Sequence, residues 1–251
     1  MDIATFNKAI WIWIIVAVVI LPVAVRIAAP YGRHTREGWG PMIDNKLGWI
    51  IMEMPALALV LTYFLIGDAP KTMVSWIIIA YWVIHYGHRT LIFPFMLRTK
   101  GKKMPVGIMF SAIFFNLFNS FFIGYYLGYL ADYSIDWLTD PRFIIGSILF
   151  FTGMYINWRA DYSLINLRKP GETGYKIPRG WLFKYISCPN HFGEIIEWLG
   201  FAILFWAMPG LSFFIWTFAN LVPRTLNHHK WYQEKFADYP KERKAVFPFV
   251  L

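Results

Sequence analysis

Long apolar stretches alternate with short polar loops along nearly the whole chain. Each stretch is close to the roughly 17 to 25 residues that an α-helix needs to cross a bilayer. The stretches fall at residues 6 to 28, 47 to 67, 73 to 97, 105 to 131, 142 to 165, 192 to 208 and 210 to 226. The last two are separated by Pro209 and Gly210, which disfavour the interior of a helix. The pattern predicts an all-α integral membrane protein with seven transmembrane helices.

Composition agrees with a lipid environment. The chain is 57% hydrophobic and only 16% charged, whereas about a quarter of the residues in a soluble domain are charged. The net charge of +9 does not indicate nucleic-acid binding, because the basic residues lie between apolar stretches and no base-stacking motif is present. The single cysteine, Cys188, excludes an intramolecular disulfide and a zinc site built on several thiolates. We therefore expect no nucleic acid and no metal, and we interpret Cys188 as a packing residue.

The distribution of basic residues predicts the orientation in the membrane. Lys and Arg are retained preferentially in cytoplasmic loops. They gather after the first, third and fifth stretches, whereas residues 131 to 140, after the fourth, carry three Asp and neither Lys nor Arg. The N-terminus is therefore expected outside and the C-terminus in the cytoplasm. The basic residues of these loops are Arg26, Arg33, Arg36 and Lys46, then Arg98, Lys100, Lys102 and Lys103, then Arg168, Lys169, Lys176, Arg179 and Lys184.

The last part of the chain, from Asn227 to Leu251, mixes cations with aromatic residues such as Trp231, Tyr232 and Tyr239. Such a segment can lie in the membrane interface, with its cations among the headgroups and its rings below them. No internal repeat or low-complexity tract interrupts the chain, so residues 1 to 251 are expected to form a single seven-helix domain.

Several ionisable or amide side chains interrupt the apolar stretches. An ionisable group inside a transmembrane helix costs at least about 2.5 to 3.5 kcal/mol on insertion scales, so each one needs an explanation. Glu53 lies two residues before Pro55 in the second stretch, and Tyr86 and Arg89 lie on adjoining parts of one face in the third. A structural network between helices could account for them, but their density favours a functional pocket. For Asn116 and Asn119 in the fourth stretch, interhelical hydrogen bonding and a functional role remain equal alternatives.

A second polar zone follows at the predicted cytoplasmic side. Polar residues recur there at spacings of three and four, which places them on single helical faces. The loop at residues 167 to 180 adds glycines, prolines and charges of both signs, without a Walker or Rossmann phosphate motif. A charged, water-soluble partner could fill this zone, while an apolar substrate could enter the pocket near Glu53 from the lipid. The recurring polar residues are Asn157 and Asp161, then Asn190, Glu194 and Glu197, then Arg224, His228 and Tyr232.

The motifs in these zones resemble those of the steroid 5α-reductase family. The resemblance extends over nearly the whole chain from about residue 30, and the short, compact chain leads us to expect a bacterial homologue. The motifs lie at residues 31 to 35, 53 to 55, 85 to 90, 157 to 161, 167 to 172, 175 to 178, 190 to 198, 228 to 232 and 236 to 240.

The resemblance implies a seven-helix bundle that binds NADPH from the cytoplasmic side, mainly through residues 157 to 232, with a catalytic pocket formed by the first four spans. The reactive pair corresponds to Glu53 and Tyr86. Many members of the family carry Gln where this chain has Met52, a substrate-pocket position that we expect to bear on the natural substrate. The implied cofactor-binding residues are Arg89, Arg98, Asn119, Asn157, Asp161, Arg168, Tyr175, Asn190, Glu194, Arg224, His228 and Tyr232.

The resulting hypothesis is an NADPH-dependent reductase of the Δ4 double bond in a 3-oxo-Δ4 steroid or a similar lipid enone. The Tyr86 hydroxyl and a protonated Glu53 would donate hydrogen bonds to the ketone oxygen as negative charge develops there. The alternatives are a membrane methyltransferase of the isoprenylcysteine type and a lipid transporter or scaffold, and bound dinucleotide would distinguish the reductase from both. We expect a monomer in contact with membrane lipid, in the inner membrane of a bacterium or in the endoplasmic reticulum of a eukaryote.

Overall fold

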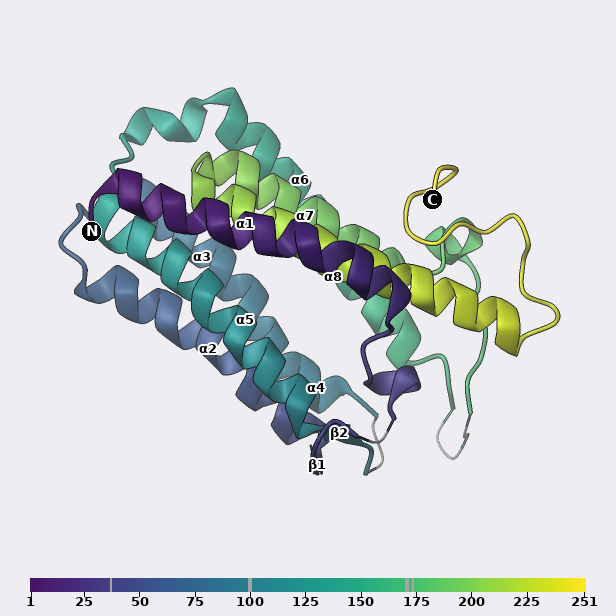
Figure 1. Ribbon diagram of the computed structural model, residues 1–251. Coiled ribbons are helices and arrows are strands. Elements are labelled where there is room, and N and C mark those ends of the chain that lie inside the picture. Colours follow the sequence, from purple (N-terminus) through teal and green to yellow (C-terminus); the bar gives the residue numbers. More distant parts are fainter. Residues whose placement is uncertain (37, 99–100, 170–171, 173) are drawn as a thin grey trace. The chain divides into compact units, whose positions relative to one another are not determined.

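The computed structural model describes residues 1–36, 38–98, 101–169, 172 and 174–251, and it is mostly helical (Figure 1). Lys100 of the predicted cytoplasmic loops, and Pro170, Gly171 and Thr173 of the loop at residues 167 to 180, lie outside the described residues.

The chain divides into two compact units. Unit 1 contains residues 1–11, 29–144 and 205–210, and unit 2 contains residues 12–28, 145–204 and 211–251. The predicted catalytic pair belongs to unit 1, whereas most of the predicted cofactor-binding residues belong to unit 2.

Each predicted apolar stretch contains a helix. The third and fourth stretches each include a π-helical turn, His88–Ile92 after α3 and Tyr126–Leu130 after α5, and the 3-10 turns are Gly32–His34, Ile135–Thr139 and Trp181–Lys184. Two short strands, β1 (Met42–Asp44) and β2 (Lys103–Pro105), pair antiparallel. The helices are α1 (Ile3–Arg26), α2 (Asn45–Ile66), α3 (Met73–Gly87), α4 (Phe93–Met96), α5 (Val106–Tyr125), α6 (Pro141–Ile165), α7 (Pro189–Phe205) and α8 (Met208–Lys235).

In unit 1, α2 and α5 pack side by side and run in the same direction. Asn116 contacts Met52 near the start of the shared interface, and Gly128, just past the end of α5, approaches Tyr63 near its end. The packing is close because a Cβ atom on Gly128 would lie 2.2 Å from the Tyr63 carbonyl oxygen. Helix α3 runs antiparallel to α2, since Trp76 near its start contacts Phe64 and Trp82 near its end contacts Ala56.

In unit 2, glycines bring α6 and α7 together. A Cβ atom on Gly153 would lie 2.3 Å from the Glu197 backbone nitrogen, and one on Gly200 would lie 2.4 Å from the Phe150 backbone nitrogen. The two helices are antiparallel, because residues early in α6 contact residues late in α7. Only glycine permits this spacing, so the glycines determine how the polar ends of the two helices meet.

The break between the last two helices differs from the prediction. It falls at Trp206 and Ala207, and Trp206 adopts a positive φ of 44°. Pro209 and Gly210 instead lie in the first turn of α8, where proline is well tolerated because no intrahelical hydrogen bond needs its missing N–H.

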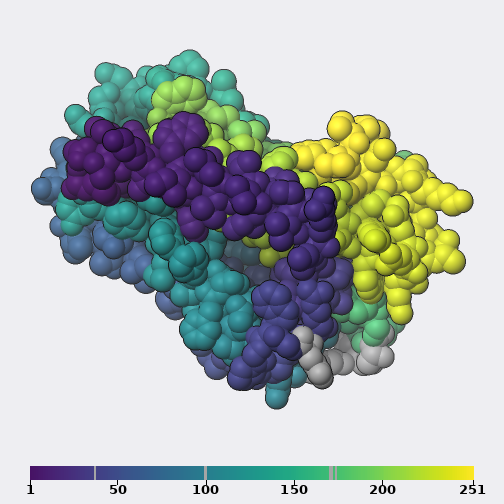
Figure 2. All heavy atoms as spheres, viewed as in Figure 1, coloured from purple at the N-terminus to yellow at the C-terminus, as the bar shows by residue number. Residues whose placement is uncertain are grey.

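The end of the chain packs within unit 2, and its location in the membrane interface stays a prediction. Helix α8 continues to Lys235, and the chain then turns back to the segment before α7, as the yellow coil in Figure 1 shows. Tyr232, Tyr239 and Val246 are buried in protein, whereas Phe249 is exposed. In Figure 2 these last residues form one continuous yellow mass over the end of α8.

Three helical segments in the described residues are long and apolar enough to cross a membrane: Ile3–Arg26, Asn45–Ile66 and Val106–Leu130. Apolar side chains of α1, including Ile12, Val18 and Val19, are exposed, as expected for a surface that faces lipid. The coarse prediction of an all-α membrane protein is therefore confirmed.

Candidate functional site

Helices α2 and α3 bring Glu53 and Tyr86 to the same level of unit 1. The Trp82 indole nitrogen donates a hydrogen bond to the Ala56 carbonyl over 2.8 Å, which fixes the register of the two antiparallel helices. Glu53 precedes Ala56 by three residues and Tyr86 follows Trp82 by four, so both lie about one helical turn from this contact in the same direction. Glu53 is only 9% exposed and Tyr86 only 5%. Two proton-bearing groups thus lie at one depth in a buried part of the unit.

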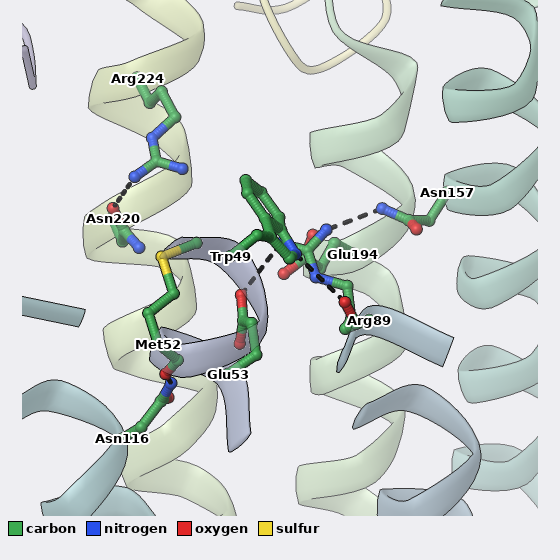
Figure 3. A network of polar contacts seen from close by, with 9 residues as sticks. All are labelled: Trp49, Met52, Glu53, Arg89, Asn116, Asn157, Glu194, Asn220 and Arg224. Carbon is green, nitrogen blue, oxygen red and sulfur yellow. Dashed lines mark hydrogen bonds and ion pairs between the residues drawn. The ribbon is translucent and has the colours of Figure 1, made fainter. Parts of the chain in front are cut away.

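Arg89 gives Glu53 a charged partner. Its Nη2 atom lies 3.7 Å from the Glu53 carboxylate oxygen Oε1 (Figure 3). Its guanidinium lies over the rings of Trp49 and Phe93. Trp49 also donates a hydrogen bond from its indole nitrogen to the Arg89 carbonyl over 3.1 Å. The contact with Arg89 pairs the carboxyl group with a cation, whereas the predicted role of Glu53 is to donate a hydrogen bond to a ketone.

Trp49 is a site residue that the sequence analysis did not identify. It lies one turn before Glu53 on α2, at a spacing of four that places it on the same face. The spacing could have indicated that Trp49 lies beside Glu53, but an aromatic residue in an apolar stretch does not stand out from its neighbours.

Met52 contributes to the site through its backbone. Its side chain packs in a buried cluster with Met104 and Met109, while its carbonyl accepts a 2.6 Å hydrogen bond from the Asn116 amide (Figure 3). The role of the Met52 side chain in a substrate pocket stays a prediction.

A cluster of amides and carboxylates lies at one end of the α6–α7 pair in unit 2. The Asn157 amide donates to the Asn190 carbonyl over 3.0 Å and to the Glu194 carboxylate over 3.4 Å. The Asn190 amide in turn donates to the Asp161 carboxylate over 3.0 Å. The structure therefore brings together four of the predicted cofactor-binding residues, two from each helix.

Helix α8 carries three more of the predicted cofactor-binding residues, Arg224, His228 and Tyr232. The Arg224 guanidinium donates to the Asn220 side chain over 3.2 Å, and the His228 ring lies 5.7 Å from that of His191. Tyr232 is buried and stacks on Tyr239.

Two members lie in the segment between α6 and α7. Arg168 donates to the Gly174 carbonyl over 3.0 Å, and the Tyr175 ring contacts Trp231. In the same segment the hydrogen bond from Lys176 lowers the pKa of Glu172, so this carboxylate is ionised at neutral pH.

Two further predicted cofactor contacts, Arg98 and Asn119, lie in unit 1 and not in the polar cluster of unit 2. Arg98 is exposed just after α4. Asn119 is 2% exposed and donates to the Phe115 carbonyl of its own helix over 2.8 Å. Their place in a cofactor site stays a prediction.

The residues of unit 2 suit a dinucleotide chemically. Carboxylates and amides can bind ribose hydroxyls and a carboxamide, and guanidinium groups such as those of Arg168 and Arg224 can pair with phosphates. His191, which the sequence analysis did not select, joins α7 to α8 through a 2.6 Å hydrogen bond from its Nδ1 atom to Thr225. Since the Thr225 hydroxyl donates to the Leu221 carbonyl, the proton in the bond to His191 lies on Nδ1.

These observations define a class: an all-α membrane protein with a buried Glu and Tyr beside a half-buried Arg in one unit and a nucleotide-compatible polar cluster in the other. Residues 102–251 match the family model described as 3-oxo-5-alpha-steroid 4-dehydrogenase. The chain belongs to this family, which confirms the predicted resemblance and favours the reductase over the methyltransferase and the transporter.

Individual relatives agree over most of their length. The chain is 44% identical to 3-oxo-5-alpha-steroid 4-dehydrogenase 1 of Bos taurus over 229 residues, covering 90% of this chain and 89% of the relative. It is 45% identical to the protein of the same name from Homo sapiens, covering 88% and 86%. It is 43% identical to the steroid 5-alpha-reductase DET2 of Arabidopsis thaliana, covering 89% and 88%.

Proposed function

We propose that the chain is an NADPH-dependent membrane reductase that saturates the Δ4 double bond of a 3-oxo-Δ4 steroid or a similar lipid enone. The observation that carries the proposal is that the buried side chains of Glu53 and Tyr86 lie at the same depth on two neighbouring helices. The chain that holds them belongs to the 3-oxo-5-alpha-steroid 4-dehydrogenase family. The relatives' names state the reaction class, and the pair supplies two hydrogen-bond donors for one ketone oxygen.

Within this proposal Tyr86 and Glu53 act on the ketone oxygen. NADPH supplies a hydride to the β-carbon of the enone, and negative charge then develops on the ketone oxygen. The Tyr86 hydroxyl and the protonated Glu53 carboxyl donate hydrogen bonds to that oxygen, and the apolar surroundings strengthen both. A proton added to the α-carbon completes the saturation, so that one hydride and one proton enter the substrate. Arg89, whose Nη2 atom lies 3.7 Å from Oε1 of Glu53, helps to orient the Glu53 carboxyl group.

The residues proposed to hold NADPH are those gathered in unit 2, namely Asn157, Asp161, Asn190 and Glu194, with Arg168, Tyr175, Arg224, His228 and Tyr232, together with Arg89, Arg98 and Asn119 of unit 1. Dinucleotide phosphates would pair with the arginines, and the sugars with the amides and carboxylates.

We further propose seven transmembrane helices, with the N-terminus outside and the C-terminus in the cytoplasm. The directions of packed helices support this arrangement. The second and fourth predicted spans run parallel, as α2 and α5, while the second and third, and likewise the fifth and sixth, run antiparallel. A chain that crosses the bilayer at every predicted span requires these directions.

The decisive experiment compares the wild-type chain with Glu53→Gln and Tyr86→Phe in purified form, in nanodiscs. We expect the wild type to bind NADPH, seen as altered nicotinamide fluorescence, and to reduce testosterone or progesterone. Each variant should retain NADPH binding and lose at least about a hundredfold in kcat, because Tyr86→Phe removes one donor to the developing oxyanion and Glu53→Gln replaces an acidic O–H donor with a weaker amide N–H donor.

A matched control is Thr62→Val on the same helix, because the Thr62 hydroxyl donates to the carbonyl of Ala58 one turn earlier in that helix. It should leave turnover unchanged. Undiminished turnover in both Glu53→Gln and Tyr86→Phe would refute the assignment of the pair, and binding of S-adenosylmethionine instead of NADPH would refute the reductase.

A further inference from the structure

Helix α5 and the turn after it direct a stripe of small and polar residues toward α2. Asn116, Ser120, Gly124 and Gly128 follow one another at intervals of four, which places them on one face. Two of them account for the close packing: a Cβ atom on Gly124 would lie 3.0 Å from the Val60 Cα atom, and one on Gly128 would be closer still to α2. The glycines account for the close approach of the two helices, whereas Asn116 and Ser120 make specific polar contacts.

Asn116 and Ser120 bind the turn of α2 that contains Pro55. The Asn116 amide donates to the Met52 carbonyl over 2.6 Å, and the Ser120 hydroxyl donates to the Pro55 carbonyl over 3.3 Å. Proline has no N–H to donate to the carbonyl four residues earlier, and its ring displaces the neighbouring carbonyls, so this turn is weakened.

A third donor comes from α3. The Trp82 indole binds the Ala56 carbonyl, and all three donor residues are almost fully buried, with exposures of 3% for Asn116 and 0% for Ser120 and Trp82. The three acceptor carbonyls, at residues 52, 55 and 56, lie on both sides of Glu53 in the sequence. Side chains from two helices thus determine the backbone that carries the Glu53 carboxyl.

We propose that Asn116 is a positioning residue for Glu53, assisted by Ser120 and Trp82, and this inference rests on the function proposed above. A carboxyl group stabilises a developing oxyanion only within hydrogen-bond reach of the ketone oxygen, so a shift of the helical turn by about 1 Å can cost about a hundredfold in rate. Asn116 does not touch the substrate in this proposal. It acts by holding the carbonyl next to Glu53.

The test uses Asn116→Leu, whose side chain is larger but branches at the same atom and cannot donate a hydrogen bond, and Ser120→Ala. Per NADPH-binding site, we expect kcat for an enone such as progesterone to fall at least about tenfold in Asn116→Leu and about two- to fivefold in Ser120→Ala. The KM for the enone and the Kd for NADPH should stay within about twofold of the wild type, because the ligand contacts are retained. The pH dependence of kcat should also move in Asn116→Leu, since the surroundings of Glu53 change.

The matched control is Ser111→Ala on α5, whose hydroxyl donates to the carbonyl of Ile108 in its own helix. It should leave both kcat and the pH profile unchanged. Hydrogen–deuterium exchange across residues 49 to 60 should rise in Asn116→Leu and not in the control. If Asn116→Leu does not fold, Ser120→Ala provides the same comparison.

Two results would overturn the inference in different ways. A variant Asn116→Leu with lower thermal stability but wild-type kcat and pH profile would show that Asn116 only joins the helices. A wild-type chain that binds NADPH but reduces no enone would refute the proposed function itself, before any variant is considered.

Discussion

The start of α6 illustrates how one charged residue can be tested by pH. The Asp140 carboxylate accepts hydrogen bonds from the backbone and the guanidinium of Arg142, and Arg142 also lies over the Trp137 ring. The side-chain hydrogen bond from Arg142 lowers the pKa of Asp140 from 3.8 to about 2. Because the folded-state pKa is depressed, this stabilisation is complete above about pH 4 and is lost as the pH falls through about 2.

The prediction compares the wild type with Asp140→Asn, which keeps an oxygen for the helix N-cap but removes the charge. The wild type should unfold at a higher temperature from pH 7 down to about pH 4, and the difference should close as the pH approaches 2. Asp136→Asn removes a like charge from the same loop and controls for net charge. A difference in unfolding temperature that is unchanged at pH 2 would mean that the ion pair is not its source.

For individual residues, the sequence predicted which side chains belong to the candidate site better than it predicted which residues they contact. Glu53, Tyr86, Asn157 and Asn190 stand out because polar groups are costly in apolar stretches, and the structure buries all but Asn190 completely. The ion pair of Glu53 with Arg89 and the contribution of Trp49 depend on how α2 and the π-helical turn pack, which spacing along one helix does not determine.

Glycines decide the packing of whole elements in both units. Gly128→Ala would place a Cβ atom 2.2 Å from the Tyr63 carbonyl, and Gly153→Ala would place one 2.3 Å from the Glu197 backbone nitrogen. These atoms belong to the backbone and cannot move aside as a side chain would. Each substitution should therefore destabilise the chain by about 1 to 3 kcal/mol, measured by unfolding in detergent.

Gly87→Ala is the matched control. Gly87 has helical dihedral angles, and nothing lies within 4 Å of the position of its Cβ atom. Alanine there should leave stability unchanged or raise it by up to about 1 kcal/mol, since it favours the helix over glycine. Equal stabilities of Gly128→Ala and Gly87→Ala would contradict the close approach of α2 and α5.

The sequence predicted the helical elements but not their irregularities. Apolar stretches of sufficient length identify α1 to α3 and α5 to α8, because a helix that crosses the bilayer needs apolar side chains along its whole length. The π-helical turns at His88–Ile92 and Tyr126–Leu130 insert a residue without changing the apolar pattern, so that pattern carries no signal for them.

At the scale of the whole molecule, composition and basic loops predict a membrane protein, but not how the end of the chain folds. The mixture of cations and aromatic rings between Asn227 and Leu251 predicts an interfacial segment, but it does not indicate which of these side chains are buried in protein. The structure buries Tyr239 and Arg243 within unit 2, where each has hydrogen-bonding and ring partners.

Ser187 is the centre of this attachment. Its hydroxyl donates to the Lys244 carbonyl over 3.1 Å and lies 2.6 Å from both the Tyr239 hydroxyl and Nδ1 of His229. Burial lowers the pKa of His229, and the nearby Arg243 and Lys244 lower it further, so the imidazole is neutral at pH 7 and can donate from Nδ1. Ser187 thereby joins the segment before α7, the end of α8 and the last residues of the chain.

We predict that Ser187→Ala weakens NADPH binding without lowering kcat at saturating cofactor. Tyr232, one of the proposed cofactor contacts, stacks on Tyr239 with nearly parallel rings 5.3 Å apart, so releasing Tyr239 frees Tyr232 as well. The Kd for NADPH, measured by nicotinamide fluorescence, should rise at least about fivefold, equivalent to about 1 kcal/mol and within the cost of leaving buried hydrogen-bonding groups unpaired. Ser163→Ala, which removes a hydroxyl that donates to its own helix at Arg159, should leave it unchanged. An unchanged Kd in Ser187→Ala, with the end of the chain newly sensitive to protease, would separate the attachment of the tail from cofactor binding.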